Sequence, residues 1–227
     1  MNLTSNRLLA ASGLCAAAAG AIFVGVQIHH PPADVAHITT TNVMIRETAK
    51  VLMSVLALVG FTGMFLRNRS RFGRLGRVAY ALVSAGYLAM FASECLIGYY
   101  LPTKAHSSPT YVQHVINAAI NHGPSGGIGA IEVLFLVMGV GYAFGGLLFG
   151  IALFRAGILS RWASVLLAYA TISALALKFL PFSFSRPFAV PDGVALIGLG
   201  ISLWRDQRSK SENLDASATM VAQPVTR

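Results

Sequence analysis

The chain has 227 residues, of which 55% are hydrophobic and only 11% are charged, and its mean hydropathy is +0.65. This composition excludes an ordinary soluble domain and predicts an integral membrane protein, because apolar runs of about 20 residues cross a bilayer as helices. The formal charge of +9 does not indicate a nucleic-acid partner, since most basic residues fall in short segments between apolar runs, where they set topology.

Six apolar runs predict an all-α fold, a polytopic membrane bundle of about six transmembrane helices. The first run resembles a signal peptide, but we interpret it as a retained span, because Leu14 before Cys15 is too large for a lipoprotein cleavage site. Residues 1–204 are expected to form one transmembrane domain, and the polar tail 205–227 is predicted to be disordered. The expected spans are Leu8–Ile28, Val43–Leu66, Leu75–Leu101, Ile128–Phe154, Arg161–Leu180 and Pro187–Trp204.

The basic residues predict the orientation of these spans. Arginines are concentrated in the segments RNRSRFGRLGR (67–77) and RAGILSR (155–161) and at the start of the tail, which places these segments and both termini on the cytoplasmic side of the cell membrane. The other connections carry few basic residues and are expected outside. The second span is predicted to begin at the cap signal Thr39-Thr40-Thr41-Asn42. The longest outer connection is predicted to hold a short helix from Pro109 to Asn121.

In this topology the charges within the spans all lie in the outer leaflet. Glu94 is seven residues from Leu101, which is about 10 Å at helical rise. Charges in lipid are costly and usually face a partner or a cavity. The alternatives are a structural ion pair for either glutamate, helix capping for Asp192 and snorkelling for Lys178. The full set is Arg46, Glu47, Lys50, Glu94, Glu132, Lys178, Arg186 and Asp192.

The residues that share a helix face with Glu132 and with Glu94 indicate where these two side chains point. Gly139, Gly146 and Gly150 follow Glu132 at helical offsets, and a stripe of small residues marks close helix packing, so Glu132 is expected to point into the bundle. Glu94 is expected to share an aromatic face. The six histidines have no HxxxH spacing, so no metal site is predicted. The residues expected to line a substrate cavity are Arg46, Glu47, Tyr87, Phe91, Phe135, Tyr142 and Arg186.

These groups suit an acid-initiated reaction. A carboxyl in an apolar pocket can stay protonated and act as an acid toward a lipophilic substrate. Aromatic faces stabilise a carbocation, and exclusion of water protects it. The catalytic candidates are Glu94, Glu132 and Asp192, and no cofactor is expected. The sequence has no P-loop, no clear magnesium-binding carboxylate cluster and no Asp-rich diphosphate motif.

Five features carry a resemblance over nearly the whole chain: HPP after the first span, Arg46 with Lys50, Glu94, GVGYAFGGLLFGIALFRA (139–156) and RPFAVPDGVALIGLGISLW (186–204). They resemble a family of small actinobacterial membrane proteins. The chain is also similar to the small integral-membrane terpene cyclases of bacterial indole sesquiterpenoid and drimentine-type pathways. That resemblance implies closure of a farnesyl chain already attached to an indole or diketopiperazine, with Glu94 or Glu132 as the acid.

The sequence therefore predicts a terpene cyclase that protonates an alkene or epoxide of a prenylated small molecule, with membrane lipid as its other partner. The alternative is a non-enzymatic membrane protein, such as a transporter, a proton relay or an accessory subunit, in which the buried charges form a structural network. Six spans with intramembrane charges fit both functions.

Overall fold

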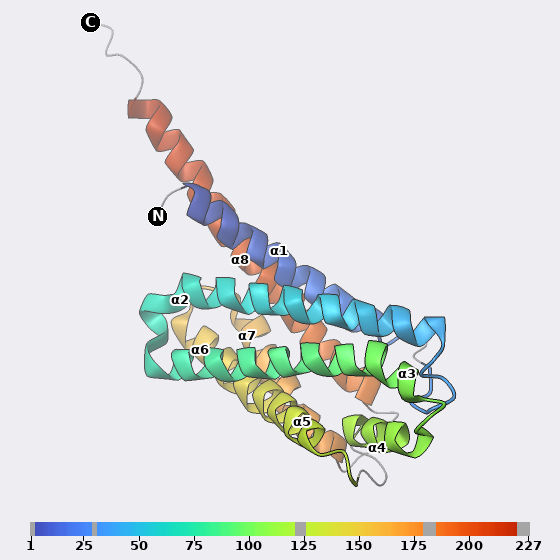
Figure 1. Ribbon diagram of the computed structural model, residues 1–227. Coiled ribbons are helices and arrows are strands. Elements are labelled where there is room, and N and C mark those ends of the chain that lie inside the picture. Colours follow the sequence, from blue (N-terminus) through green and yellow to red (C-terminus); the bar gives the residue numbers. More distant parts are fainter. Residues whose placement is uncertain (1–2, 29–30, 121–125, 179–184, 222–227) are drawn as a thin grey trace, which may run out of the picture.

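A bundle of long helices is the architecture of the chain. The computed structural model describes residues 3–28, 31–120, 126–178 and 185–221, and this part is helical without a strand, which confirms the all-α fold (Figure 1). The elements are α1 (Leu3–Gly25), α2 (Thr41–Cys95), η1 (Leu96–Tyr100), α3 (Leu101–Lys104), α4 (Pro109–Ile120), α5 (Ala130–Val140), η2 (Gly141–Gly145), α6 (Gly146–Ala156), α7 (Arg161–Ser173), η3 (Ala174–Lys178) and α8 (Ser185–Val221).

Helix α2 is a hairpin of two antiparallel arms. Gly73 has φ 56° and ψ −150°, a conformation essentially restricted to glycine, and it divides residues 41–72, the first arm, from residues 74–95, the second arm. The Thr62 and Tyr80 hydroxyls lie 2.9 Å apart across the arms, and the Phe65 ring stacks on Tyr80 at 4.3 Å. The segment 67–77, predicted as a loop, is therefore helical on both sides of one glycine.

The long helices are compatible with a multi-pass membrane protein. Four helical stretches are long and apolar enough to cross a bilayer: Ser5–Gly25, Thr41–Lys104, Ala130–Ala156 and Pro187–Lys210. The second has 64 residues and contains both arms of the hairpin, so it is far longer than the roughly 20 residues of one crossing. The helix Arg161–Ala176 is apolar but shorter. The number of crossings and the sides of the termini stay predictions.

Glycines bring α1 and α8 together as antiparallel neighbours, which run side by side in Figure 1. A Cβ on Gly13 would lie 2.6 Å from the Gly200 carbonyl oxygen, and a Cβ on Gly193 would lie 2.7 Å from the Gly20 carbonyl oxygen. Real side chains do not fit at such distances, so the two backbones touch. Close contact through small residues is a common way for helices to associate in lipid, where no hydrophobic force drives them together.

Two of the long helices contain a π-helical segment. η1 joins the second arm of α2 to α3, and η2 joins α5 to α6, in each case with helical backbone on both sides. A π-helical turn holds one residue more than an α-helical turn, so the faces before and after it are rotated relative to each other. Gly141 in η2 packs on Gly86 of the second arm, with a hypothetical Gly141 Cβ 2.5 Å from the Gly86 Cα.

The two ends of the bundle differ in their connections. One end holds Gly73 and the Arg67–Asp206 ion pair, in which the arginine Nε and Nη2 lie 2.5 and 3.1 Å from the two carboxylate oxygens. We call this the Gly73 end. The opposite end, called the Leu101 end, holds α3 and α4; α4 packs there through Val112, Val115 and Ile116.

Two local predictions agree with the structure. The Thr40 side chain accepts a hydrogen bond from the Val43 amide, which confirms the predicted cap, and α4 confirms the short helix in the long connection. The tail from Arg205, predicted to be disordered, instead continues α8 to Val221.

Candidate functional site

One group of buried charges joins the two arms of α2 near the Leu101 end. Lys50 Nζ lies 2.8 Å from Glu47 Oε1 and 3.4 Å from Glu94 Oε2. Glu47 and Lys50 are three residues apart on the first arm and share a face, whereas Glu94 comes from the second arm. The side chains of Glu47, Glu94 and Lys50 are 4%, 14% and 17% exposed, so the Glu47–Lys50–Glu94 cluster is largely buried.

This cluster has unequal charges. With all three groups ionised it carries two negative charges and one positive charge. Glu47 Oε2 is buried without a hydrogen-bond partner in the described part of the chain. Gly98 of η1 lies against Glu47, whose Cβ would be 2.6 Å from a Gly98 Cβ, so the glycine makes room for the carboxylate. One additional proton would make the cluster neutral.

A second acid lies deeper, between three helical elements. Asp192 of α8 accepts hydrogen bonds on Oδ2 from the hydroxyls of Tyr87 in the second arm, at 3.4 Å, and Tyr142 in η2, at 3.2 Å. The Asp192 side chain is fully buried, and Oδ1 has no partner within the described ranges. No cationic side chain of the described residues forms a salt bridge with Asp192. We call these three residues the Asp192 site.

The Asp192 site lies near the middle of the bundle. Tyr87 is the midpoint between Gly73 and Leu101, about 21 Å from each at helical rise. The hydrocarbon core of a bilayer is about 30 Å thick, so a residue at this midpoint would lie deep within any bilayer that the two arms crossed.

The sequence placed Asp192 at the outer start of its span, as a catalytic candidate with helix capping as the alternative. The capping alternative is wrong, because α8 begins at Ser185, so Asp192 is within the helix. It directly follows Pro191, whose missing N–H leaves the carbonyl of Pro187 without its helical partner.

Glu132 does not point into the bundle. It lies exposed in the first turn of α5. Gly139, seven residues later on the same helix face, is also unpacked, because a Cβ there would meet no atom within 4 Å. Gly146 and Gly150 do pack closely, against Thr171 and Ser164 of α7. The expected stripe ends at η2, because the extra residue of a π turn rotates the helix face by about 100°.

The remaining predicted site residues lie apart. Arg46 Nε donates to Asn42 Oδ1 at 2.8 Å, and its Nη1 donates to the Val26 carbonyl at 2.9 Å. Phe91 is exposed, and Phe135 packs near α4. The side chains of Arg186 and Lys178 lie outside the described residues. The single cavity expected from the sequence is therefore replaced by two clusters, one around Lys50 and one around Asp192.

A repeated dipeptide marks the Asp192 site, and the sequence analysis missed it. Gly86-Tyr87 and Gly141-Tyr142 are both Gly-Tyr pairs, and the two glycines contact each other. This contact sets the two tyrosine rings 6.2 Å apart, with both hydroxyls on one oxygen of Asp192. Gly-Tyr in two apolar runs is a signal for such a contact, although Gly98-Tyr99 also carries it, so the dipeptide alone does not select the pair that meets.

Two other features lie away from both clusters. His37 Nδ1 is 2.7 Å from Asp34 Oδ1 in the connection after α1, and this hydrogen bond lowers the pKa of Asp34.

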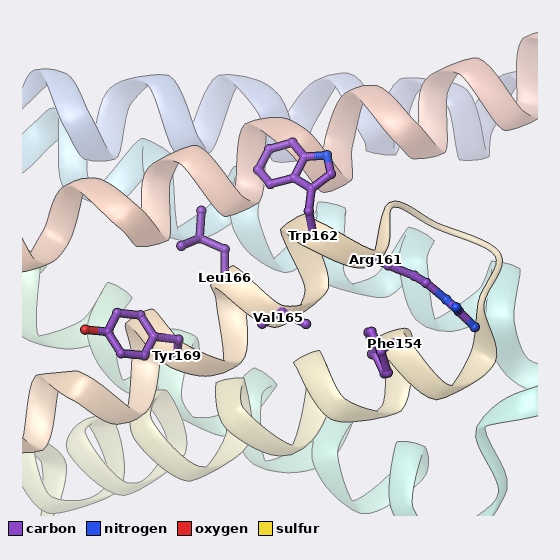
Figure 2. Close-up of a pocket in the computed structure, with 6 residues that line it drawn as sticks. All are labelled: Phe154, Arg161, Trp162, Val165, Leu166 and Tyr169. Atoms are coloured by element: carbon purple, nitrogen blue, oxygen red, sulfur yellow. The ribbon is translucent and has the colours of Figure 1, made fainter.

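Among the described residues, no group of three or more His, Cys, Asp or Glu side chains could hold a metal ion. An open apolar groove runs along α7 and includes no acidic residue (Figure 2).

Comparison with known proteins adds no relative. No protein-family model, curated protein or solved structure matches the chain. The resemblance to actinobacterial membrane proteins and to membrane terpene cyclases therefore stays a prediction. What the chain shows by itself is an all-helical protein with several long apolar helices, compatible with a membrane bundle, and two buried acidic sites.

Proposed function

We propose that the chain is a proton relay of the membrane, in which carboxyl groups at two depths take up protons and hand them on. The observation that carries this proposal is Asp192. It is an acid sealed near the middle of the bundle, with two tyrosine hydroxyls as partners and no salt bridge among the described residues. An isolated carboxylate in lipid is costly, and intramembrane acids commonly serve proton pathways.

The Glu47–Lys50–Glu94 cluster is the site of this relay that takes up a proton first. It is slightly exposed, so protons can reach it from the Leu101 end, and its excess negative charge favours a proton. Glu94 and Tyr87 are seven residues apart on one face of the second arm, about 10 Å along the axis. This separation exceeds one hydrogen bond, so transfer to Asp192 requires bridging water.

Polar groups continue beyond Asp192 toward the Gly73 end. Ser84 and Tyr80 precede Tyr87 by three and seven residues, which keeps all three on one helix face. The Ser84 hydroxyl is buried without a partner in the described part, and the Tyr80 hydroxyl is bonded to Thr62 at 2.9 Å. These hydroxyls support a route that crosses the bundle.

The cyclase is a second candidate, and the aromatic surroundings of Asp192 favour it. The rings of Tyr87 and Tyr142 flank the acid, and Phe61 lies edge-on to Tyr87 at 5.1 Å. Such faces would stabilise a carbocation. However, Asp192, Tyr87 and Phe61 are all buried, so a prenylated substrate would have to displace packed side chains. The relay needs room only for bridging water molecules, which are far smaller than a prenylated substrate, and it is therefore the better supported function.

Proton flux into liposomes tests the relay. Purified protein is reconstituted with a pH-sensitive dye inside, and a potassium gradient with valinomycin drives proton entry. Asp192→Asn keeps the shape of the side chain but cannot exchange a proton, so flux should fall to the level of empty liposomes. Asp34→Asn removes an acid outside the bundle interior and should leave flux unchanged. Undiminished flux in Asp192→Asn, or no flux in the unaltered protein, would refute the relay.

The same preparations separate the two functions. Farnesylated indole and diketopiperazine acceptors are incubated with the membranes, and the products are analysed by mass spectrometry and chromatography. A cyclised product that is lost in Asp192→Asn, together with absent proton flux, would establish the cyclase in place of the relay.

A further inference from the structure

The outer face of α7 carries an open groove with one charged end. In Figure 2, Trp162 and Leu166 project toward α8, Tyr169 lies further along α7, and Arg161 extends over Phe154 of α6. Trp162 and Tyr169 are 58% and 62% exposed, so neither side chain belongs to the packed core. The groove is lined by Phe154, Arg161, Trp162, Val165, Leu166 and Tyr169.

Packing between α7 and α8 fixes one wall of this groove. The Trp162 ring lies against Gly198 of α8, with its Cη2 only 2.6 Å from the position of a Gly198 Cβ. The ring is thus held beside α8 and one of its faces stays exposed. An exposed, positioned tryptophan next to an arginine at the first residue of an apolar helix is typical of the interface between lipid and water.

The charge at the groove is left uncompensated. The Arg161 guanidinium lies 5.2 Å from the centre of the Phe154 ring, and Arg161 forms no salt bridge with any described residue. The same end of the bundle is rich in arginine, including Arg71, which bonds the Ala156 carbonyl, and Arg155 in the last turn of α6. The groove therefore combines one cationic end with an apolar wall.

We propose that this groove binds one anionic phospholipid, whose headgroup phosphate pairs with Arg161 and whose acyl chain lies along Val165, Leu166 and Tyr169. The charge pattern matches such a molecule, which has a negative group at one end and an apolar chain behind it. Arg161 and Tyr169 are eight residues apart, about 12 Å, which is close to the half-thickness of the hydrocarbon core. The basic residues also predict that this end faces the cytoplasmic leaflet, where anionic lipids attract arginine.

Native mass spectrometry of the full chain in detergent tests this site. The protein is titrated with dioleoyl phosphatidylglycerol and, separately, with dioleoyl phosphatidylcholine, and the bound lipids are counted. The unaltered protein should retain one phosphatidylglycerol in preference to phosphatidylcholine. Arg161→Gln should weaken phosphatidylglycerol binding about fivefold, the equivalent of about 1 kcal/mol for one arginine near anionic lipid. Arg155→Gln removes the same charge from the same end but outside the groove, and should have no effect on this lipid.

Filling the groove separates the acyl chain from the headgroup. Val165→Trp should block the chain and abolish retention of both lipids while Arg161 stays in place, and an unchanged thermal midpoint shows that the variant is folded. Equal retention of the two lipids, or equal loss in Arg161→Gln and Arg155→Gln, would identify ordinary surrounding lipid and overturn the proposal. A dimer mass that Val165→Trp removes would identify a second copy of the chain as the occupant, which also overturns it.

Discussion

Replacing Lys50 by methionine tests whether the Glu47–Lys50–Glu94 cluster holds the hairpin together. The substitution keeps an unbranched side chain of similar length and removes the cation that forms salt bridges with both glutamates. Two contacts are lost, at 2.8 and 3.4 Å, and two largely buried carboxylates are left facing each other's charge. Breaking a buried pair in this way costs about 3–5 kcal/mol, so the free energy of unfolding should fall by that amount.

The measurement is reversible unfolding in mixed micelles, followed by circular dichroism. Lys104→Met is the matched control, because Lys104 also lies near the Leu101 end, but its ammonium contacts the Tyr100 ring at 5.8 Å rather than a carboxylate. That contact is worth about 0.5–1 kcal/mol. Adding Glu47→Gln and Glu94→Gln to Lys50→Met should restore most of the stability, since no charged group then remains in the cluster. Equal stability of Lys50→Met and Lys104→Met would refute the reasoning.

Three further outcomes are expected. Gly20→Leu should separate α1 from α8 and destabilise the bundle by about 1–3 kcal/mol, whereas Gly25→Leu, with no atom within 4 Å of its Cβ, should be neutral in the same unfolding assay. The lowered pKa of Asp34 means that its bond to His37 stabilises the connection at neutral pH, and this contribution should vanish as pH falls below about 4. Amide exchange of residues 34–40 should then rise in the unaltered protein, whereas Asp34→Asn should show no such step. A cysteine at position 34 should react with a membrane-impermeant maleimide on intact cells, and one at Ser209 only after permeabilisation; the opposite pattern would reverse the predicted orientation.

The helices could be predicted because their signals are local. A run of apolar residues, the cap at Thr40 and the amphipathic pattern of 109–120 each determine structure over one or a few turns. The sequence analysis also placed Lys50 and Glu94 in one set of charges within the spans, because charges in lipid usually face a partner or a cavity, and the structure pairs these two.

The arrangement of the acids could not be predicted, because a single additional residue in a helix changes which side chains share a face. A π turn adds that residue without any break in the apolar pattern, so the stripe from Glu132 to Gly150 looked continuous. The depth of Asp192 was missed for a related reason. The expected span began at Pro187, whereas α8 already begins at Ser185 and includes the prolines at 187 and 191. The pairing of Tyr87 with Tyr142 depends on a contact between two helices, which no single periodicity contains.

The hairpin around Gly73 has a consequence for how the chain is made. Lys50 and Glu94 are 44 residues apart in sequence, so at a synthesis rate of about 5–20 residues per second the acid emerges roughly 2–9 seconds after the lysine. During that interval the start of the first arm would carry Arg46, Glu47 and Lys50 into lipid, with one positive charge in excess because Glu94 is still missing. The first arm is therefore expected to wait in the insertion machinery and enter the bilayer together with the second, as one folded unit, so that the tight turn at Gly73 sets the timing of membrane insertion as well as the shape of the bundle.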